Sequence, residues 1–370
     1  MKPFSACDDC LRRTDLVAEL APWVDVEWRR RDAKARVLAL PDEELLAIMR
    51  SGEASRRYAR FRPERAREAI TAAGLIAACR CADGYPPALN DLADPPAVLH
   101  VAGDPAALAG DDTAGVVGAR QATPYGLNVA RELGRGVSAA GVTVVSGLAL
   151  GVDSAAHEGA LASALAGSPD PRPPVIAVLA GGADTPYPAS KRRLYAAVRS
   201  HGAVVSEMPP GFGIWRWAFV ARNRIIAALS RVLVVVEAAE RSGSLTTADL
   251  AGEIGRTVAA VPGRVTNRLA AGTNSLLRDG AALVRGPSDV LDLLSGVSGR
   301  TYPPPDLAAQ DTDLPDLLAA LLRGVGEGRG TLAELAAGTD ARTVLAGLGE
   351  LEARGLVRRG FGGRYERALT

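Results

Sequence analysis

FVARNRIIAALSRVLVVVEAAERSGSLTTA, residues 219–248, is the stretch that decides the fold of this chain. Its centre, Val232–Val236, is a continuous apolar run of the kind found in strands buried on both faces of a parallel sheet. The cluster Arg222-Asn223-Arg224 precedes this strand, and Ser242-Gly243-Ser244 follows it and opens a helix. Backbone N–H groups and the helix dipole favour an anion at such a helix start. The stretch therefore predicts an α/β fold with a site for phosphate groups.

The same order of strand, glycine loop and helix recurs along the chain. Short apolar strands are predicted near residues 115–118, 142–145, 175–179, 203–205 and 257–261. This alternation predicts a mostly parallel sheet, and ligands bind such sheets beyond the carboxyl ends of the strands. Neither the GxGxxG dinucleotide fingerprint nor a P-loop is present. A tight turn explains any one glycine loop by itself, whereas the whole set indicates a ligand that carries phosphate.

Composition limits the classes of function. The 370 residues have a formal net charge of +1, so the whole chain does not show the basic excess of many nucleic-acid-binding proteins. No stretch reaches the ~18 apolar residues of a membrane helix, and the first residues lack the apolar core of a signal peptide. We therefore expect a cytoplasmic protein that does not contact a membrane.

Four cysteines occur in two pairs, Cys7-x-x-Cys10 and Cys79-x-Cys81. Four cysteines in a chain of this length do not indicate a disulfide scaffold. Together they have the composition of a zinc site, but the second pair is closer than the usual C-x-x-C spacing. Zinc ligands and free thiols both remain open, and the sequence predicts neither a metal nor another cofactor.

Changes in composition divide the chain into four parts. We predict a helical domain at 1–82, similar to SAM or helix-hairpin-helix domains, a Rossmann-like domain at 83–297, a proline-stiffened linker at 298–313 and a winged-helix domain at 314–370. The last is indicated by a capping box at Thr331–Glu334, a helix after Asp340 and a hairpin at Gly362-Gly363. A solvated helix face explains the arginines of the first domain better than DNA contact does. The third helix of the last domain suits contacts with protein as well as with DNA.

The motifs of residues 86–282 resemble those of the DprA family, also called Smf, the DNA-processing proteins of natural transformation. The matching motifs are Val117-Gly-Ala-Arg120, Ser146-Gly-Leu-Ala149, Gly151-Val-Asp153, Tyr187-Pro188, Ser206-Glu207, Arg222 to Ser230, Ser242-Gly-Ser-Leu-Thr246, Val261-Pro-Gly263 and Gly272-Thr-Asn274. Leu150 and Lys191 depart from the family pattern. Lys191 stands where the family often has asparagine followed by a basic residue, so Arg192 is expected to carry that basic role, alone or shared with Lys191.

The resemblance implies what the chain does. Members of the family bind single-stranded DNA, protect the incoming strand, form homodimers and load the RecA recombinase. A single-strand-binding protein is a further candidate partner. The resemblance implies that residues 83–297 bind DNA and that the protein is not an enzyme.

The predicted site combines the loops with this resemblance. The candidate DNA-binding residues are Gly118, Arg120, Ser146, Gly147, Lys191, Arg192, Arg222, Asn223, Arg224, Ser242, Gly243 and Ser244. Trp215, Trp217 and Phe219 are expected either to flank this site, where bases stack on them, or to anchor a loop. The resemblance places a dimer contact at Leu276, Leu277, Leu283 and Val284, although core packing explains these residues equally well.

The sequence is also compatible with other functions. His157 could be taken for a base, but capping and packing at a helix start explain it, and Glu207 and Glu237 are expected to brace loops. A phosphoribohydrolase of the LOG type is an alternative, although residues 240–247 lack its Pro-Gly-Gly-x-Gly-Thr loop. A duplex-binding winged-helix regulator is another, and comparing single-stranded with duplex DNA separates it from the first interpretation.

Overall fold

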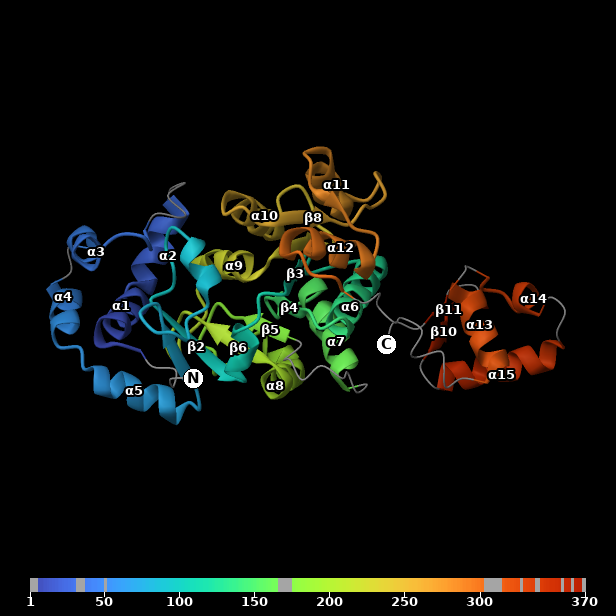
Figure 1. The fold of residues 1–370 in the computed structure, drawn as a ribbon, viewed down its shortest axis with the longest axis horizontal. Helices are drawn as coiled ribbons and strands as arrows, with labels where there is room; N and C mark the ends of the chain where they lie inside the picture. The colour runs from blue at the N-terminus through green and yellow to red at the C-terminus, as the bar shows by residue number, and fades with distance from the viewer. Residues whose placement is uncertain are drawn as a thin grey trace. The chain divides into compact units, whose positions relative to one another are not determined.

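The computed structural model describes residues 6–30, 37–49, 52–165, 175–302, 315–326, 329–336, 340–353, 356–360 and 363–367. The chain divides into two compact units, Met1–Pro305 and Asp306–Thr370 (Figure 1). No helix in the part that the structure describes combines the length and the apolar character of a membrane span.

The first unit is built on one sheet, which has nine strands among the described residues, in the order β1-β2-β6-β5-β4-β3-β7-β8-β9. The strands are β1 Ile76–Cys79, β2 Val98–Gly103, β3 Thr113–Val117, β4 Thr143–Ser146, β5 Val175–Val178, β6 Ala203–Ser206, β7 Val232–Val235, β8 Thr257–Ala260 and β9 Ala282–Leu283. Strands β3 to β9 are parallel to their neighbours, except that β6 also pairs antiparallel with β2, which in turn pairs antiparallel with β1. The mostly parallel Rossmann-like sheet predicted from the sequence is confirmed.

The order of the strands reverses beside β3. The chain adds β4, β5 and β6 on one side of β3 and then β7, β8 and β9 on the other. The helices that follow the strands are α6 Pro124–Ala139, α7 Val152–Leu165, α8 Arg192–His201, α9 Arg216–Leu229, α10 Gly243–Glu253, α11 Ala271–Arg278 and α12 Pro287–Ser298. Ligands of open α/β sheets bind at such a reversal, beyond the carboxyl ends of the strands. We call this side of the sheet the carboxyl edge.

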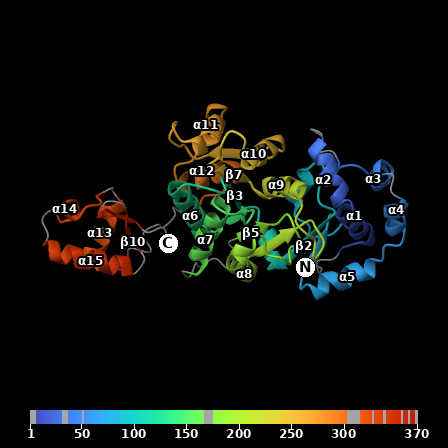
Figure 2. The same ribbon diagram turned by 180° about the vertical axis from the view of Figure 1, so that it is seen from behind.

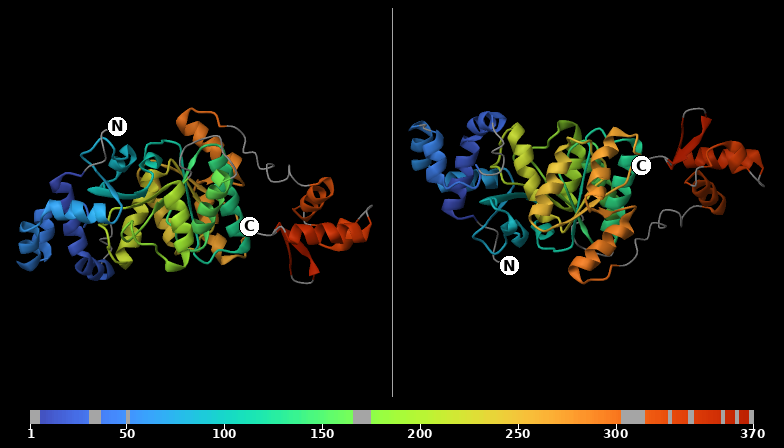
Figure 3. Two further views of the ribbon diagram at one scale, coloured as in Figure 1. Left: turned by 90° about the horizontal axis from the view of Figure 1, so that it is seen from below. Right: turned by 90° about the horizontal axis from the view of Figure 1, so that it is seen from above.

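Alternate residues of each strand point to opposite faces, and each face has its own core. Val116 and Val144 lie in the core that α6, α7, α8 and α12 cover. Val117 and Val145 lie in the core that α9 and α10 cover. Helices therefore lie on both faces of the sheet (Figure 3). Because both faces of the sheet are buried, the strand sequences are continuous apolar runs and do not alternate between apolar and polar residues.

The N-terminal helices pack on the same unit (Figure 2). They are α1 Asp8–Glu19, α2 Ala21–Arg30, α3 Asp42–Met49, α4 Gly52–Ala59 and α5 Pro63–Ala72. Leu11 of α1 and Ile70 of α5 join the core on the α6–α8 face. Leu20 and Val24 belong to a separate cluster with Trp217 of α9. The segment is helical as predicted, and the domain boundary after residue 82 stays a prediction.

The second unit consists of three helices and a hairpin among its described residues. Its elements are α13 Asp316–Gly326, α14 Leu332–Leu335, α15 Ala341–Ala353, β10 Val357–Arg359 and β11 Tyr365–Arg367. The predicted capping box joins Thr331 and Glu334, and β10 pairs antiparallel with β11. Gly362 and residues 303–313 of the predicted linker lie outside the described residues. The winged-helix prediction agrees with these elements.

Candidate nucleic-acid interface

The loop after β4 is held in an unusual backbone conformation. Leu148 has a φ of 53° although it is not a glycine, and Gly151 has a φ of 80°. A Cβ atom at Gly147 would collide with the guanidinium of Arg222, which lies directly behind the loop. Left-handed backbone at a residue other than glycine persists only where the surroundings impose it, and it is concentrated at functional sites. The sequence Ser146–Gly151 therefore gives a rigid loop at the carboxyl edge.

Arg222 supports this loop from inside the protein. Its Nη1 donates to the carbonyl oxygens of Gly147, at 2.8 Å, and Val178, at 2.6 Å. Asp153 accepts a hydrogen bond from the amide of Gly147 at 3.1 Å. Burial lowers the pKa of Arg222 to about 10, and the carboxylate of Asp153 acts in the opposite sense. Arg222 is thus charged at neutral pH and braces the loops after β4 and β5.

Arg224 is also buried, and its side chain is only 7% exposed. Its guanidinium donates to both carboxylate oxygens of Glu207, at 2.8 and 2.7 Å, and to Asp94 at 2.9 Å. Burial opposes the charge, but the two carboxylates raise the pKa of Arg224. The expectation that Arg222 and Arg224 contact phosphates does not fit this structure, because both groups are buried and bonded to protein oxygens. Glu207 braces a loop, as predicted.

Three exposed or half-exposed side chains from separate segments meet at the carboxyl edge. The guanidinium carbon of Arg120, after β3, lies 5.1 Å from the ring centroid of Phe219 in α9. The ring centroid of Tyr187, which follows β5, lies 5.7 Å from that of Phe219 at an interplanar angle of 50°. Tyr187 is 41% exposed. We call Arg120, Tyr187 and Phe219 the aromatic cluster.

Sequence reasoning missed Tyr187 as a site residue and included Trp217 among the candidates for stacking. Trp217 is 0% exposed and packs with the N-terminal helices, so the alternative that it anchors a loop is the one that fits. Trp215 is half-buried. The sequence did contain a feature that could have identified Tyr187. Tyr187-Pro188 lies shortly after Gly181-Gly182, the glycine pair that follows the buried strand β5.

Basic residues at the start of α8 lie on the same side of the sheet. Arg192 and Arg193 are exposed in the first turn of α8, which contains no acidic residue. Cations are unfavourable at the positive end of a helix dipole, whereas an anion is favoured there. Lys191 is half-buried, and its Nζ lies 3.1 Å from the carboxylate of Glu158. Arg192 is therefore better placed than Lys191 to meet a phosphate.

The predicted anion site at the start of α10 has mixed charge. Ser242 caps α10 by accepting from the amide of Ser244, and Asn223 donates to the carbonyl of Gly243 at 3.3 Å. The adjoining hollow of about 460 Å³ is lined by Arg241 but also by three carboxylates, those of Glu240, Asp249 and Asp279. These carboxylates weaken the attraction of this turn for phosphate.

The polar residues that could suggest catalysis are buried or hydrogen-bonded within the protein. His157 is fully buried, and burial lowers its pKa to about 3. Glu237 accepts hydrogen bonds from the amide and hydroxyl of Thr123, at 2.8 and 2.6 Å, and so holds the start of α6. Gly118 fits closely between Val152 and the carbonyl of Glu237. Thr123 and Glu237 also line a cavity of about 640 Å³ at the strand reversal.

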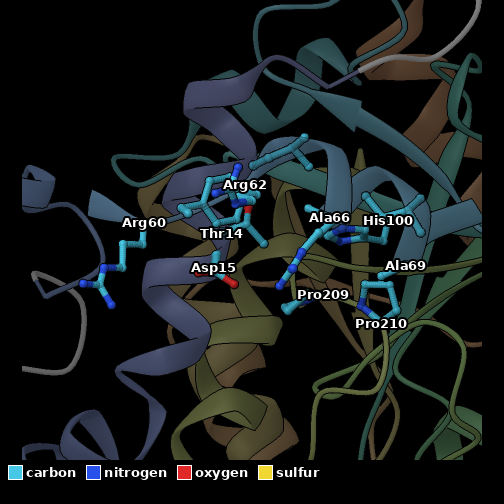
Figure 4. A pocket seen from close by; sticks show the side chains of 13 residues that line it. Thr14, Asp15, Arg60, Arg62, Ala66, Ala69, His100, Pro209 and Pro210 are labelled. Carbon is cyan, nitrogen blue, oxygen red and sulfur yellow. The ribbon is translucent and has the colours of Figure 1, made fainter. Parts of the chain in front are cut away.

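A further hollow of about 420 Å³ lies between the N-terminal helices and the sheet. Figure 4 shows Thr14 and Asp15 of α1 facing Ala66 and Ala69 of α5, with His100 and the prolines that follow β6 beside them. Arg60, Arg62 and Arg65 also line this hollow and are exposed. Arg57 and Arg67 instead pair with carboxylates of the same helical segment. Arg57 and Arg67 are therefore engaged within the helical segment, whereas Arg60, Arg62 and Arg65 border the hollow.

The predicted dimer residues fall into two groups. Val284 is fully buried in the core, so it cannot contact a second chain, and the prediction is corrected for that residue. Leu276 and Leu277 are half-buried, and Leu283 is 51% exposed on β9, the last strand of the sheet. A dimer contact at these three leucines stays a prediction.

Comparisons with known proteins show which family the chain is similar to. The family model for DNA recombination-mediator protein A matches residues 77–295. A curated relative from Mycobacterium tuberculosis is 42% identical over 252 residues, which span 66% of this chain and 61% of the relative. The DNA processing protein DprA of Bacillus subtilis is 37% identical over 210 residues, which span 57% of this chain and 68% of that protein.

Two solved structures are similar as well. The X-ray structure of DprA from Streptococcus pneumoniae aligns with a TM-score of 0.60 at 30% identity and covers 76% of this chain and 95% of its own. A structure of DprA from Helicobacter pylori aligns with a TM-score of 0.52 at 30% identity and covers 57% of this chain and 93% of its own. The latter is described by its single-stranded DNA binding mode.

Proposed function

The chain belongs to the DNA recombination-mediator protein A family, and from this premise we propose that it binds single-stranded DNA along its carboxyl edge. The observation that carries the proposal is the aromatic cluster, in which Arg120 lies over Phe219 and Tyr187 lies beside it. Unpaired bases can stack on aromatic rings, whereas the bases of a duplex are already stacked on each other. This surface therefore favours a single strand.

Phosphate contacts complete the proposed interface. Arg120, Arg192 and Arg193 are exposed and supply the positive charge that a phosphate backbone needs. The Arg60–Arg65 hollow includes Pro209 and Pro210, which follow β6 on the same edge. We propose that a bound strand runs from the aromatic cluster towards this hollow. Ser146 and Gly147 shape the edge, with Arg222 as their internal support.

The similarity to the DprA of Helicobacter pylori supports this proposal, because that protein is described as binding single-stranded DNA. By the same family membership we propose that the protein acts as a homodimer in the cytoplasm, protects the strand and loads a RecA-type recombinase onto it. It performs this work without a catalytic step of its own. The matched region spans 61% of the first curated relative, so this function is proposed for the region that the two share.

Equilibrium binding tests the proposal. Fluorescence anisotropy with a labelled oligothymidine and a duplex of equal length, across a salt series, should give tighter binding to the single strand at every salt concentration. Arg120→Ala with Tyr187→Ala should weaken single-strand binding. Arg199→Ala, an exposed arginine in the last turn of α8, is the matched control. Tighter binding to one duplex sequence would instead assign the main DNA contact to the winged helix.

Loading of a recombinase needs its own assay. With single-stranded DNA coated by single-strand-binding protein, adding this chain should shorten the lag before RecA hydrolyses ATP. The Arg120→Ala, Tyr187→Ala variant should lengthen that lag again, because a chain that does not hold the strand cannot deliver the recombinase to it. An unchanged lag with the intact protein would reject loading and leave DNA binding in place.

A further inference from the structure

The four cysteines of the described residues lie together, although about 70 positions separate the two pairs. One sulfur from each of Cys7, Cys10, Cys79 and Cys81 lies within 4.8 Å of the other three. The Sγ atoms of Cys10 and Cys81 are 3.7 Å apart. All four residues are free cysteines in this structure. The packing of α1 against β1 therefore gathers every cysteine of the chain at one point.

Local structure explains how each pair presents two sulfurs to one centre. Cys7 is the N-cap of α1 and Cys10 lies in its first turn, so the two side chains lie three positions apart on one helix face. Cys79 ends β1, and the next turn is closed by the amide of Ala82, which donates to the carbonyl of Cys79 at 2.9 Å. This turn brings Cys81 back beside Cys79.

The distances fit a tetrahedral metal site better than a disulfide. With zinc–sulfur bonds of about 2.3 Å, two sulfurs at the corners of a tetrahedron lie about 3.8 Å apart. The 3.7 Å between Cys10 and Cys81 is close to that value, whereas a disulfide requires about 2.05 Å. The amide of Cys7 also donates to the sulfur of Cys79, at 3.4 Å.

We propose that Cys7, Cys10, Cys79 and Cys81 bind one Zn²⁺ ion through four thiolates. Four protein ligands fill the tetrahedral shell and leave no position for substrate, which is the pattern of a structural zinc site. The ion would tie the first turn of α1 to the end of β1. Because α1 leads into the helices that cover Trp217, the site holds the N-terminal helical segment on the α/β unit. The proposal is independent of DNA binding.

Metal analysis of the full chain tests it. The protein is expressed with added zinc and purified with a reductant but without a chelator, and its metals are measured by plasma emission. We expect about one zinc per chain in the intact protein. Cys81→Ser is the first variant, because Cys81 is exposed and its replacement least affects packing. The variant should lose zinc, and Ser163→Ala, on α7, should retain it.

A second measurement keeps the proposal testable if a cysteine variant unfolds. The intact protein is stripped of metal under reducing conditions and titrated with Co²⁺, which should give the ligand-field and charge-transfer absorption of a tetrahedral tetrathiolate, saturating at one ion per chain. Adding Zn²⁺ should displace the cobalt and raise the unfolding temperature, whereas Mg²⁺ should do neither. No cobalt spectrum and no zinc in reduced, folded protein would overturn the proposal, as would iron at full occupancy or two disulfides found by mass spectrometry.

Discussion

Arg120 and Phe219 are far apart in the sequence, yet the guanidinium carbon of Arg120 lies 5.1 Å from the ring centroid of Phe219. One residue follows β3 and the other belongs to α9, so the strand reversal of the sheet brings them to one edge. Tyr187 adds a third segment to the same cluster. A cation next to two aromatic rings suits a chain that carries both phosphates and bases.

Tyr187 should contribute to binding through its ring. Tyr187→Ala should weaken single-strand binding by about 1–3 kcal/mol, or roughly 5- to 150-fold, because stacking on one base is removed. Duplex binding should change little. Tyr187→Phe keeps the ring and should keep most of the affinity in the same anisotropy titration. Equally weakened binding by the two variants would point to the hydroxyl and reject stacking.

Arg192 and Arg193 should act through charge. Replacing either with alanine should weaken binding to all single-stranded sequences alike. It should also reduce the slope of log K against log salt by about 0.7 for each phosphate that the arginine neutralises. Arg199→Ala, in the last turn of the same helix, should leave the slope unchanged. A sequence-dependent effect at Arg192 would indicate that it reads bases.

Arg224 should contribute to the stability of the fold rather than to DNA binding. Arg224→Ala leaves Glu207 and Asp94 without their buried partner, which typically costs about 3–5 kcal/mol of unfolding free energy. Adding Glu207→Gln and Asp94→Asn removes the stranded charges and should restore part of this stability in urea titrations. If the Arg224→Ala protein were stable but bound DNA more weakly, the result would contradict this prediction and indicate that Arg224 contacts DNA.

His157 should make folding stability depend on pH. Burial lowers its pKa to about 3 in the folded state, against about 6.5 in an unfolded chain. The stabilising effect of the neutral ring is complete above about pH 6.5 and is lost as the pH falls towards the folded value. Between these limits the unfolding free energy falls by about 1.4 kcal/mol per pH unit. His157→Asn should lack this part of the slope, and parallel curves for the two proteins would contradict the prediction.

Leu283 tests self-association. It is exposed on the last strand of the sheet, so Leu283→Glu should fold normally and shift the sedimentation of the protein from dimer to monomer if this edge is the contact. Val284→Glu, by contrast, should prevent folding because Val284 belongs to the core. An intact dimer of the Leu283 variant would move the interface elsewhere.

Patterns of apolar residues predicted the sheet because its strands are buried on both faces. The same patterns could not distinguish the half-buried Trp215 and Phe219 from the fully buried Trp217, since all three side chains are large and lie close together in the sequence. Only the packing of the N-terminal helices on α9 decides that Trp217 is inside.

The sequence predicted which loops form the candidate site, but it did not predict which side chains of these loops are exposed. Glycine motifs indicated the carboxyl edge, because tight loops after buried strands need small residues. The partners of Arg222 and Arg224 come from distant loops, such as Val178 and Asp94. The sequence therefore indicated that arginines lie near the predicted phosphate site. It could not show that the side chains of Arg222 and Arg224 are buried and bonded to protein oxygens. The cysteine cluster likewise depends on a contact between α1 and β1 that spacing does not encode.

Photochemical cross-linking tests the central claim most directly. Single-stranded DNA with 5-iodouracil is bound to the intact protein, irradiated and digested, and the linked residues are identified by mass spectrometry. We predict cross-links at Tyr187 or Phe219, which disappear from the alanine variants. Cross-links confined to residues 315–367 of the second unit, with none on the carboxyl edge, would contradict a single-strand site on the sheet.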